Sequence, residues 1–469
     1  MNKFVFVFGI FDVVHQGHYR LFNFAKSLGE RLVVGLIQAK KNSYSGATIE
    51  ERKKALLDSG LINEVVFIDN GIEEYLKNYK PSIVVKGIEL DLQMSENQTK
   101  LVENYGGRIV YWSDSVISRY EVLEKKNSKL QEYCLRNKIT KKDIDEVLQK
   151  IKNLKGVIIG DSIVDEYVNC KVVGVSQEDP TIVVTPLNEK KFVGGAAIIA
   201  SHAANILNSS SLFTKTGIDV AYEFMRERLT DYGVRDAIFF KEQQYKTTVK
   251  RRYITDEKTQ LRVNDFDDGI IDNKHISLLM KKLDDIKNDI DFIILSDFSL
   301  GMVSSNLIQK VISFCKSNNI FVAADSQVSS KIGDITKFCG VNYVCPTEVE
   351  ARVSLHDNHN NLAVIGKKLL ERINTDKCVI TLGKDGVFVC SSPTHDNKKE
   401  LDNLPALSDK AIDVSGAGDV FLLISTCALT VGADIWMASL LGSLAAKKQV
   451  EQIGNTPISL DDLSVKIGS

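Results

Sequence analysis

The stretch Asp413-Val414-Ser415-Gly416-Ala417-Gly418-Asp419 runs directly into the apolar segment VFLLISTCAL (420–429). Glycines just ahead of a helix let backbone N–H groups approach a phosphate, and the helix N-terminus adds partial positive charge. Asp419, at the inner edge of such a cradle, is placed to accept the proton of an acceptor hydroxyl while a γ-phosphoryl group is transferred. The pattern predicts Asp419 as a kinase base, with Ser415, Gly416, Ala417 and Gly418 around the phosphate. The alternative is that the glycines only shape a turn and that Asp419 only caps the helix.

Length and composition limit the kinds of protein in which this motif can occur. A chain of 469 residues is too long for one ordinary core, so two or three domains are expected. The 59 Lys and Arg residues nearly balance the 61 Asp and Glu residues, which does not favour a nucleic-acid partner. The eight cysteines form no CxxC pair, which argues against zinc and predicts reduced thiols in the cytoplasm. The apolar start FVFVFGIF (4–11) is expected to be a buried strand rather than a signal peptide, and the run 420–433 is too short to span a membrane.

The first part of the chain alternates between strands and helices. Apolar strands are expected at 4–8, 31–37, 64–68, 82–87 and 108–112, with helical segments between them. This alternation predicts a parallel, doubly wound sheet, whose ligand lies beyond the C-terminal ends of the strands. His15 and His18 follow the first strand and flank Gly17, so on a first helical turn both would point the same way and donate hydrogen bonds to a phosphate. For a single histidine, a packed structural role is the competing interpretation.

The stretch GIFDVVHQGH (9–18) resembles the GxFDxxHxGH signature of the cytidylyltransferase-like nucleotidyltransferases. The resemblance covers about residues 1–125 and implies a Rossmann-like domain that joins a phosphorylated substrate to a nucleoside triphosphate. It implies that the triphosphate is contacted by His15 and His18, and that the remaining nucleotide-binding residues are Gly9, Phe11, Asp12, Gly17, Lys40, Lys41, Arg52 and Ser118. Arg119 and Tyr120 depart from the Ser-Thr-Thr type turn usual at that point. Residues 126–154 are expected to be a helical linker, with a capping box starting at Thr140.

The second part restarts the strand pattern at GVIIGDSIVDEYV (156–168), and further apolar strands near 291–297, 320–325, 343–350 and 378–386 end in polar residues. The motifs GDxxxD, GGAA, TxGxxG and DVSGAGD, in this order, resemble the ribokinase-type carbohydrate kinases over residues 155–469. The resemblance implies a ribokinase-like domain with a small β lid, nucleotide binding by Thr381, Gly383 and Gly386, and Glu350 near magnesium. It also implies a sugar site at Asp161, Asp165, Gly194 and Gly195. Ile198 and Thr347 stand where the family usually has asparagine.

The runs 176–184 and 247–263 look most like the kinase half of the bifunctional heptose 7-phosphate kinase/heptose 1-phosphate adenylyltransferases, which normally carry the kinase first. The expected function is therefore twofold: phosphorylation of a sugar, a heptose 7-phosphate at O1, by Mg-ATP, and nucleotidyl transfer from ATP or CTP to the sugar 1-phosphate. The alternatives are a kinase/cytidylyltransferase for another sugar or polyol phosphate, and a regulator that binds nucleotide or sugar without turnover. A homodimer is expected, because strands near 168–187 and 247–263 form a lid or a dimer clasp in similar kinases.

Overall fold

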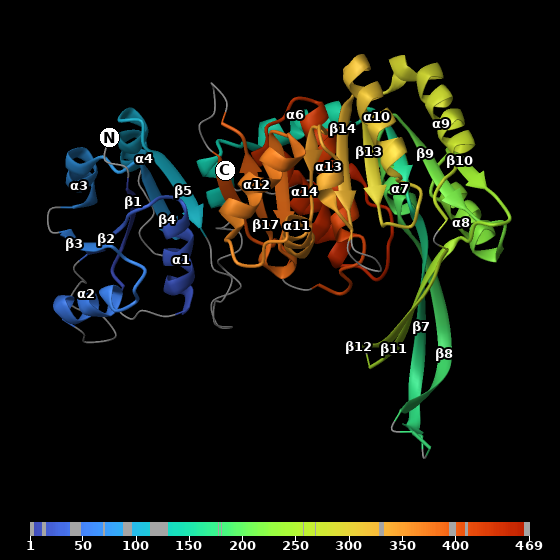
Figure 1. Ribbon diagram of the computed structural model, residues 1–469, viewed down its shortest axis with the longest axis horizontal. Helices are drawn as coiled ribbons and strands as arrows, with labels where there is room; N and C mark the ends of the chain where they lie inside the picture. Colours follow the sequence, from blue (N-terminus) through green and yellow to red (C-terminus); the bar gives the residue numbers. More distant parts are fainter. Residues whose placement is uncertain are drawn as a thin grey trace.

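Two helix-covered β-sheets and a projecting β-ribbon make up the chain in this computed structural model (Figure 1). The structure describes residues 4–11, 16–37, 48–68, 71–87, 96–112, 130–176, 178–179, 181–256, 258–267, 269–327, 333–393, 400–408 and 411–463. Within these ranges, no helix has both the length and the apolar character needed to cross a membrane.

The N-terminal sheet is five-stranded and parallel, in the order β3-β2-β1-β4-β5. The chain runs from β1 outward to β3 and then returns to the other side of β1, so the topological switch lies between β1 and β4. Its elements are β1 (Val5–Gly9), α1 (Gln16–Ser27), β2 (Leu32–Ile37), α2 (Ile49–Leu57), β3 (Glu64–Ile68), α3 (Ile72–Tyr79), β4 (Ile83–Gly87), α4 (Glu96–Asn104) and β5 (Arg108–Trp112). The expected doubly wound domain is confirmed.

The C-terminal sheet is nine-stranded, in the order β10-β9-β6-β13-β14-β15-β16-β17-β18. It is parallel from β10 to β16, and β17 and β18 are antiparallel at one edge. The strands are β6 (Lys155–Gly160), β9 (Ser209–Thr216), β10 (Asp236–Lys241), β13 (Phe292–Asp297), β14 (Phe321–Ser326), β15 (Tyr343–Val344), β16 (Lys377–Thr381), β17 (Val387–Ser391) and β18 (Leu401–Leu404). The helices are α6 (Lys141–Ile151), α7 (Ala196–Ile206), α8 (Val220–Asp231), α9 (Asn273–Asp285), α10 (Ser305–Asn318), α11 (Glu348–Leu355), α12 (Leu362–Ile373), α13 (Ala417–Thr430) and α14 (Ile435–Val450).

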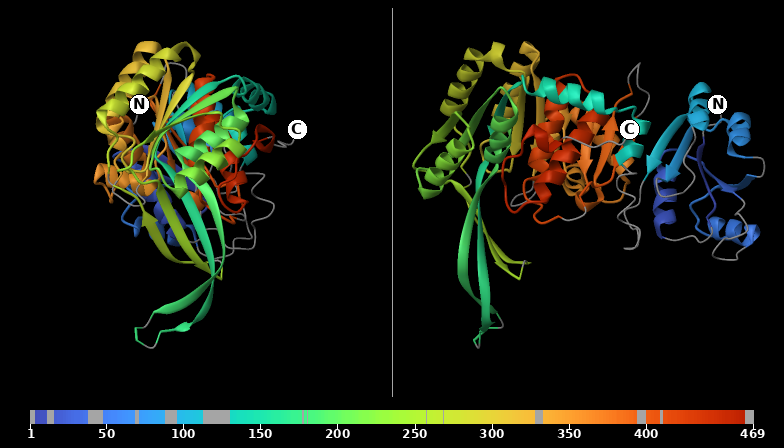
Figure 2. Two further views of the ribbon diagram at one scale, coloured as in Figure 1. Left: turned by 90° about the vertical axis from the view of Figure 1, so that its right-hand side faces the viewer. Right: turned by 180° about the vertical axis from the view of Figure 1, so that it is seen from behind.

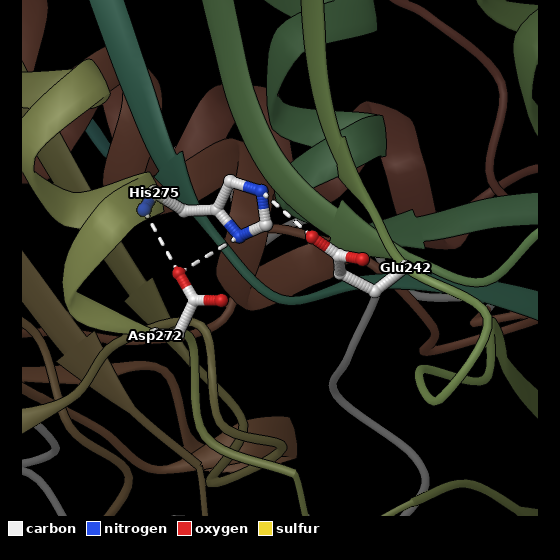
Figure 3. Close-up of side chains that lie close together, drawn as sticks. All are labelled: Glu242, Asp272 and His275. Carbon is white, nitrogen blue, oxygen red and sulfur yellow. Dashed lines mark hydrogen bonds and ion pairs between the residues drawn. The ribbon is translucent and has the colours of Figure 1, made fainter.

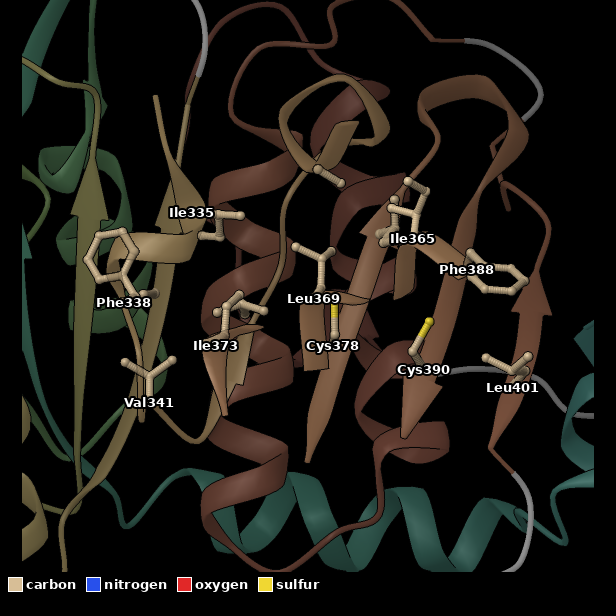
Figure 4. Close-up of a cluster of buried hydrophobic side chains, with 14 of the residues drawn as sticks. Ile335, Phe338, Val341, Ile365, Leu369, Ile373, Cys378, Phe388, Cys390 and Leu401 are labelled. Carbon is tan, nitrogen blue, oxygen red and sulfur yellow. The ribbon is translucent and has the colours of Figure 1, made fainter. Parts of the chain in front are cut away.

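Helix α12 shows how the sequence builds this layer. Its N-cap Asn361 accepts from the backbone N–H of Val364, and Asn374 ends the helix in the left-handed conformation. The buried residues Ile365, Leu369 and Ile373 recur at helical spacing, and this face belongs to the same apolar cluster as side chains of β16 and β17 (Figure 4).

A separate four-stranded sheet, in the order β12-β11-β7-β8, projects from the body as the expected lid (Figures 1 and 2). It consists of β7 (Ser162–Val175), β8 (Ile182–Gly195), β11 (Thr248–Thr255) and β12 (Lys258–Asp265). The roots of β7 and β8 are buried, whereas their outer halves are exposed. β7 and β8 therefore each have one end inside the kinase domain and the other end in solvent.

The segment expected to be a linker packs into the kinase core. Residues 130–136 are helical and α6 follows, and Tyr133, Ile144 and Ile151 are buried in the cluster that also contains α13 and α14. The Tyr133 hydroxyl donates to the Trp436 carbonyl at 3.0 Å. The segment is helical, as expected, but its apolar face belongs to the kinase domain.

The two sheets meet edge to edge, where β5 lies against β18. Arg108 of β5 forms an ion pair with Glu400, and the rings of Phe24 on α1 and Phe388 on β17 have centroids 6.3 Å apart.

Candidate active site

The DVSGAGD stretch forms a tight loop that leads into α13. Gly416 is the N-cap, with φ of 74°, a conformation that favours glycine, and a Cβ there would collide with Asn455. Asp413 accepts hydrogen bonds from the Ser415 N–H, the Gly454 N–H and the Tyr167 hydroxyl, which fix the loop. A Cβ on Gly418 would meet no heavy atom within 4 Å among the described residues, so packing does not require this glycine. The helix N-terminus therefore has room beside it for an oxyanion.

Asp419 lies in the first turn of α13 and is 6% exposed. Burial raises its pKa to about 7, and repulsion from Asp165 and Glu350 adds to this effect, whereas the Lys250 ammonium opposes it. A carboxylate with a pKa near neutrality suits a general base, because it can hold and release a proton at physiological pH.

The ends of lid strands β7 and β11 nearest the kinase core place ionic side chains near Asp419. Arg252 on β11 pairs with Asp165 on β7 at 2.7 Å, and the Lys250 ammonium lies 4.9 Å from the centre of the Phe298 ring. Burial raises the pKa of Asp165 in spite of the attraction of Arg252 and Lys250. A Cβ on Gly194 would collide with the Asp165 carboxylate, which explains the glycine. The Asp165 carboxylate is therefore the group that packs against the Gly194 backbone.

Asp161 makes its hydrogen bonds to backbone groups of a loop. Its carboxylate accepts from the backbone N–H groups of Phe298, Leu300 and Met302 at 2.9–3.1 Å, and so holds the loop after β13. Burial and the nearby Asp297 raise its pKa. Gly195 has φ of 59°, and a Cβ there would collide with the Asp161 carbonyl oxygen. Asp161 thus holds the loop after β13, Gly195 permits the close approach of the Asp161 backbone, and the contact of both residues with a sugar stays a prediction.

Two further carboxylates act on Asp419 electrostatically. Asp325, at the end of β14, is buried, and burial followed by repulsion from Glu350 and Asp419 raises its pKa well above the ordinary value. Glu350 and Thr347 form a capping box at the start of α11, so Thr347 performs a helix-capping role at the position where asparagine was expected. Buried carboxylates that repel each other fit the oxygen donors that Mg²⁺ prefers, because a divalent cation would relieve the repulsion.

Thr381, Gly383 and Gly386 lie at the end of β16 and in the turn to β17. Gly383 and Gly386 have φ of 59° and 94°, and the Gly386 N–H donates to the Gly383 carbonyl. Thr381 bridges to Thr347, so this turn adjoins the start of α11. Ile198 is fully buried in the apolar core and offers no polar group at its position.

The predicted nucleotidyl-transfer residues are described only in part. His18 is half-buried on α1, its ring 5.1 Å from Phe11 and 6.2 Å from Phe22 between centroids. Gly9 ends β1 and Gly17 lies in α1. Arg52 on α2 donates to the carbonyls of Ile10 and Ile37, which ties together the segments after β1 and β2. The structure does not describe Asp12, His15, Lys40, Lys41, Ser118, Arg119 and Tyr120.

A second polar cluster lies at the sheet edge near β10. His275 stands between Asp272 and Glu242, with nitrogen–oxygen distances of 3.2 and 3.4 Å (Figure 3). Asp272 also caps α9 by accepting from the His275 N–H. The helix cap made by Asp272 accounts for the positions of Asp272 and His275, so the cluster needs no further role.

Sequence reasoning missed several residues of the kinase site. Asp325 ends an apolar strand, and that position was the signal that could have identified it. Lys250 and Arg252 belong to a segment noted only for its family likeness. Tyr167 and Asn455 carried no local signal, because their partners Asp413 and Asp165 are distant in sequence.

This arrangement defines a kinase-type site on a ribokinase-like fold, and comparison with known proteins agrees. The chain belongs to the pfkB family of carbohydrate kinases, whose model matches residues 157–462. A second model, cytidylyltransferase-like, matches residues 6–192, which places the two families along this chain in the predicted order.

The curated relatives are named as bifunctional proteins. The chain is 28% identical over 314 residues to the bifunctional protein HldE of Campylobacter jejuni subsp. doylei, covering 66% of this chain and 64% of that protein. It is 28% identical over 308 residues to HldE of Helicobacter hepaticus, covering 65% and 62%. The matches thus span less than two thirds of the length of these relatives.

Solved structures show the same fold for the kinase part. Arabidopsis thaliana ribokinase, complexed with ribose and ATP, superimposes with a TM-score of 0.53 at 14% identity, covering 66% of this chain and 97% of that one. Escherichia coli phosphofructokinase-2 gives 0.52 at 14% identity, with the same coverage. The predicted fold class is confirmed.

Proposed function

We propose that this chain is a bifunctional transferase that makes a nucleotide-activated sugar. The C-terminal domain phosphorylates a sugar, a heptose 7-phosphate at O1, with ATP, and the N-terminal domain transfers a nucleotidyl group from ATP or CTP to the sugar 1-phosphate, releasing pyrophosphate. The likeness to HldE supports the heptose assignment. The buried Asp419 at the N-terminus of α13, with its pKa near neutrality, is the observation that carries the kinase half.

The kinase step follows from the residues around Asp419. Asp419 takes the proton of the attacking hydroxyl, and the N-terminus of α13, with Ser415, Gly416, Ala417 and Gly418, stabilises the transferring phosphoryl group. Lys250 and Arg252 balance the negative charge of Asp165 and Asp419 and orient the acceptor. Asp325 and Glu350 would hold Mg²⁺, which neutralises phosphate charge when bound.

One observation favours a different acceptor as the second candidate. Ile198 is buried where the family usually offers an asparagine, so this position donates no hydrogen bond to a sugar. Another sugar or polyol phosphate is therefore the alternative substrate.

The lid supports a homodimer. Its outer strands expose apolar side chains that a second copy would cover, among them Val173, Val175, Ile182, Leu187 and Leu261. Light scattering after size-exclusion chromatography tests this assembly. Reduced cysteines support the proposed cytoplasmic location, since all eight are free.

Mass spectrometry tests the proposed function directly. The purified full chain is incubated with Mg-ATP or Mg-CTP and a panel of sugar 7-phosphates, sugar 1-phosphates and free sugars. A bisphosphate from a heptose 7-phosphate and a nucleoside-diphosphate heptose from the 1-phosphate are the expected products. Products from another sugar only would select the alternative substrate, and no product from any sugar would refute the enzyme.

A further inference from the structure

Lys86 is a buried amine that the kinase and histidine chemistry above do not use. It is 2% exposed, and its Nζ has no hydrogen-bond partner among the residues that the structure describes. The Nζ lies 4.2 Å from the centre of the Phe8 ring. Burial lowers its pKa to about 8, so the amine remains largely protonated at neutral pH.

The position of Lys86 in the sheet is the second observation. Lys86 is the penultimate residue of β4, which pairs in parallel with β1 through Val7 and Val85. The strand order places the topological switch between these two strands. In open α/β sheets, ligands bind outside the carboxyl ends of the strands at this switch.

Lys86 and His18 lie on opposite faces of this sheet. Phe8, beneath the Lys86 ammonium, belongs to the apolar cluster shared with α3 and α4. Phe11 and Phe22, beside His18, belong to the cluster on the α1 side. Lys86 on β4 and His18 on α1 thus flank the switch, one on each face of the sheet.

A purely structural role does not explain an ammonium at this point. An unpaired buried charge lowers stability, and a ring face offsets only part of that cost. Methionine would fill a similar volume without the charge. Groups of this kind are expected where a ligand supplies the missing counter-charge.

We propose that Lys86 binds a phosphate oxyanion of a substrate at the switch between β1 and β4, an inference that rests on the proposed nucleotidyl transfer. The donor triphosphate and the phosphate of the acceptor sugar share this chemistry. Lys86 stabilises the anion by a charged hydrogen bond and takes part in no bond-breaking step.

The test uses the full chain and compares Lys86→Met with Lys53→Met. Lys53 is a matched control, because its ammonium lies 4.8 Å from the centre of the Phe67 ring in the same domain. For Lys86→Met we expect a ligand-free melting temperature equal to or above wild type, unchanged kinase kcat and KM, and about a 10- to 100-fold loss of nucleotidyl-transfer kcat/KM. A higher KM for the nucleoside triphosphate identifies the donor, and a higher KM for heptose 1-phosphate identifies the acceptor. Lys86→Arg, which keeps the charge, should recover part of the loss.

Two results would overturn the inference. One is nucleotidyl transfer by Lys86→Met within about twofold of wild type. The other is a marked fall in the melting temperature of both Lys86 variants, which would show a structural role. If wild type releases no pyrophosphate, the proposed nucleotidyl transfer has failed, and thermal-shift titrations with ATP, CTP and pyrophosphate then decide. Stabilisation of wild type that Lys86→Met lacks supports the site, whereas equal or absent shifts refute it.

Discussion

Arg136 fastens the segment before α6 to the edge of the kinase sheet, and its removal should destabilise that domain severely. The guanidinium donates through Nε and Nη2 to the Asp402 carboxylate at 3.1–3.2 Å, and through Nη2 to the Asn403 carbonyl at 2.6 Å. The Arg136 side chain is 9% exposed and the Asp402 side chain 0%. In Arg136→Ala, Asp402 loses the Arg136 guanidinium and keeps hydrogen bonds from the Asn137 amide and the Asn403 N–H.

The magnitude follows from this burial. Breaking a buried ion pair by removing one partner costs about 3–5 kcal/mol, because the remaining buried charge loses its counter-ion. Since a domain is typically stable by about 5–15 kcal/mol, the variant should lose a large part of its free energy of unfolding. Exchange of both partners, Arg136→Leu with Asp402→Leu, should recover most of the loss.

Urea unfolding, followed by the fluorescence of Trp436, reports on the unfolding of the kinase domain. The chain has two tryptophans, so Trp112→Phe serves as the background in which Trp436 alone reports. Lys142→Ala is the control, because its ion pair with Glu146 is exposed and should change the free energy by less than about 0.5 kcal/mol. A loss below about 1 kcal/mol in Arg136→Ala would refute the argument that this segment is part of the kinase core.

Three further predictions concern catalysis. Asp419→Asn should lower kinase kcat by about 10²- to 10⁴-fold with little change in ATP binding measured by calorimetry, and wild-type turnover would show that Asp419 is not the base. Because burial raises the pKa of Asp419 to about 7 and the base must be deprotonated, kinase kcat/KM should fall about tenfold per pH unit below that value and level off above it; a flat profile between pH 5 and 8 would contradict this role. His18→Ala should stop pyrophosphate release in a coupled assay and leave the kinase rate unchanged, whereas loss of both activities would indicate one coupled site.

Local patterns predicted the architecture well, because the signals that define it lie within short stretches. The alternation of strands and helices predicted both doubly wound sheets, and DVSGAGD predicted the start of α13. The roles of Asp161 and of residues 130–154 depend on partners far along the chain: the backbone N–H groups of Phe298 and Met302, and the β18 carboxylate of Asp402. Spacing within a motif does not reveal such partners. The family resemblance predicts Asp161 as a sugar ligand, and its hydrogen bonds to the loop after β13 are a further role that the sequence did not reveal.

The contact between β5 and β18 has a practical consequence for anyone who divides this chain. β18 is the outermost strand of its sheet, and β5 of the other domain lies alongside it. Outermost strands present unpaired backbone groups that recruit further strands, and natural proteins cover them. A kinase half expressed alone would lose this cover, and aggregation beyond the proposed lid-mediated dimer would reflect an uncovered sheet edge rather than a defective core.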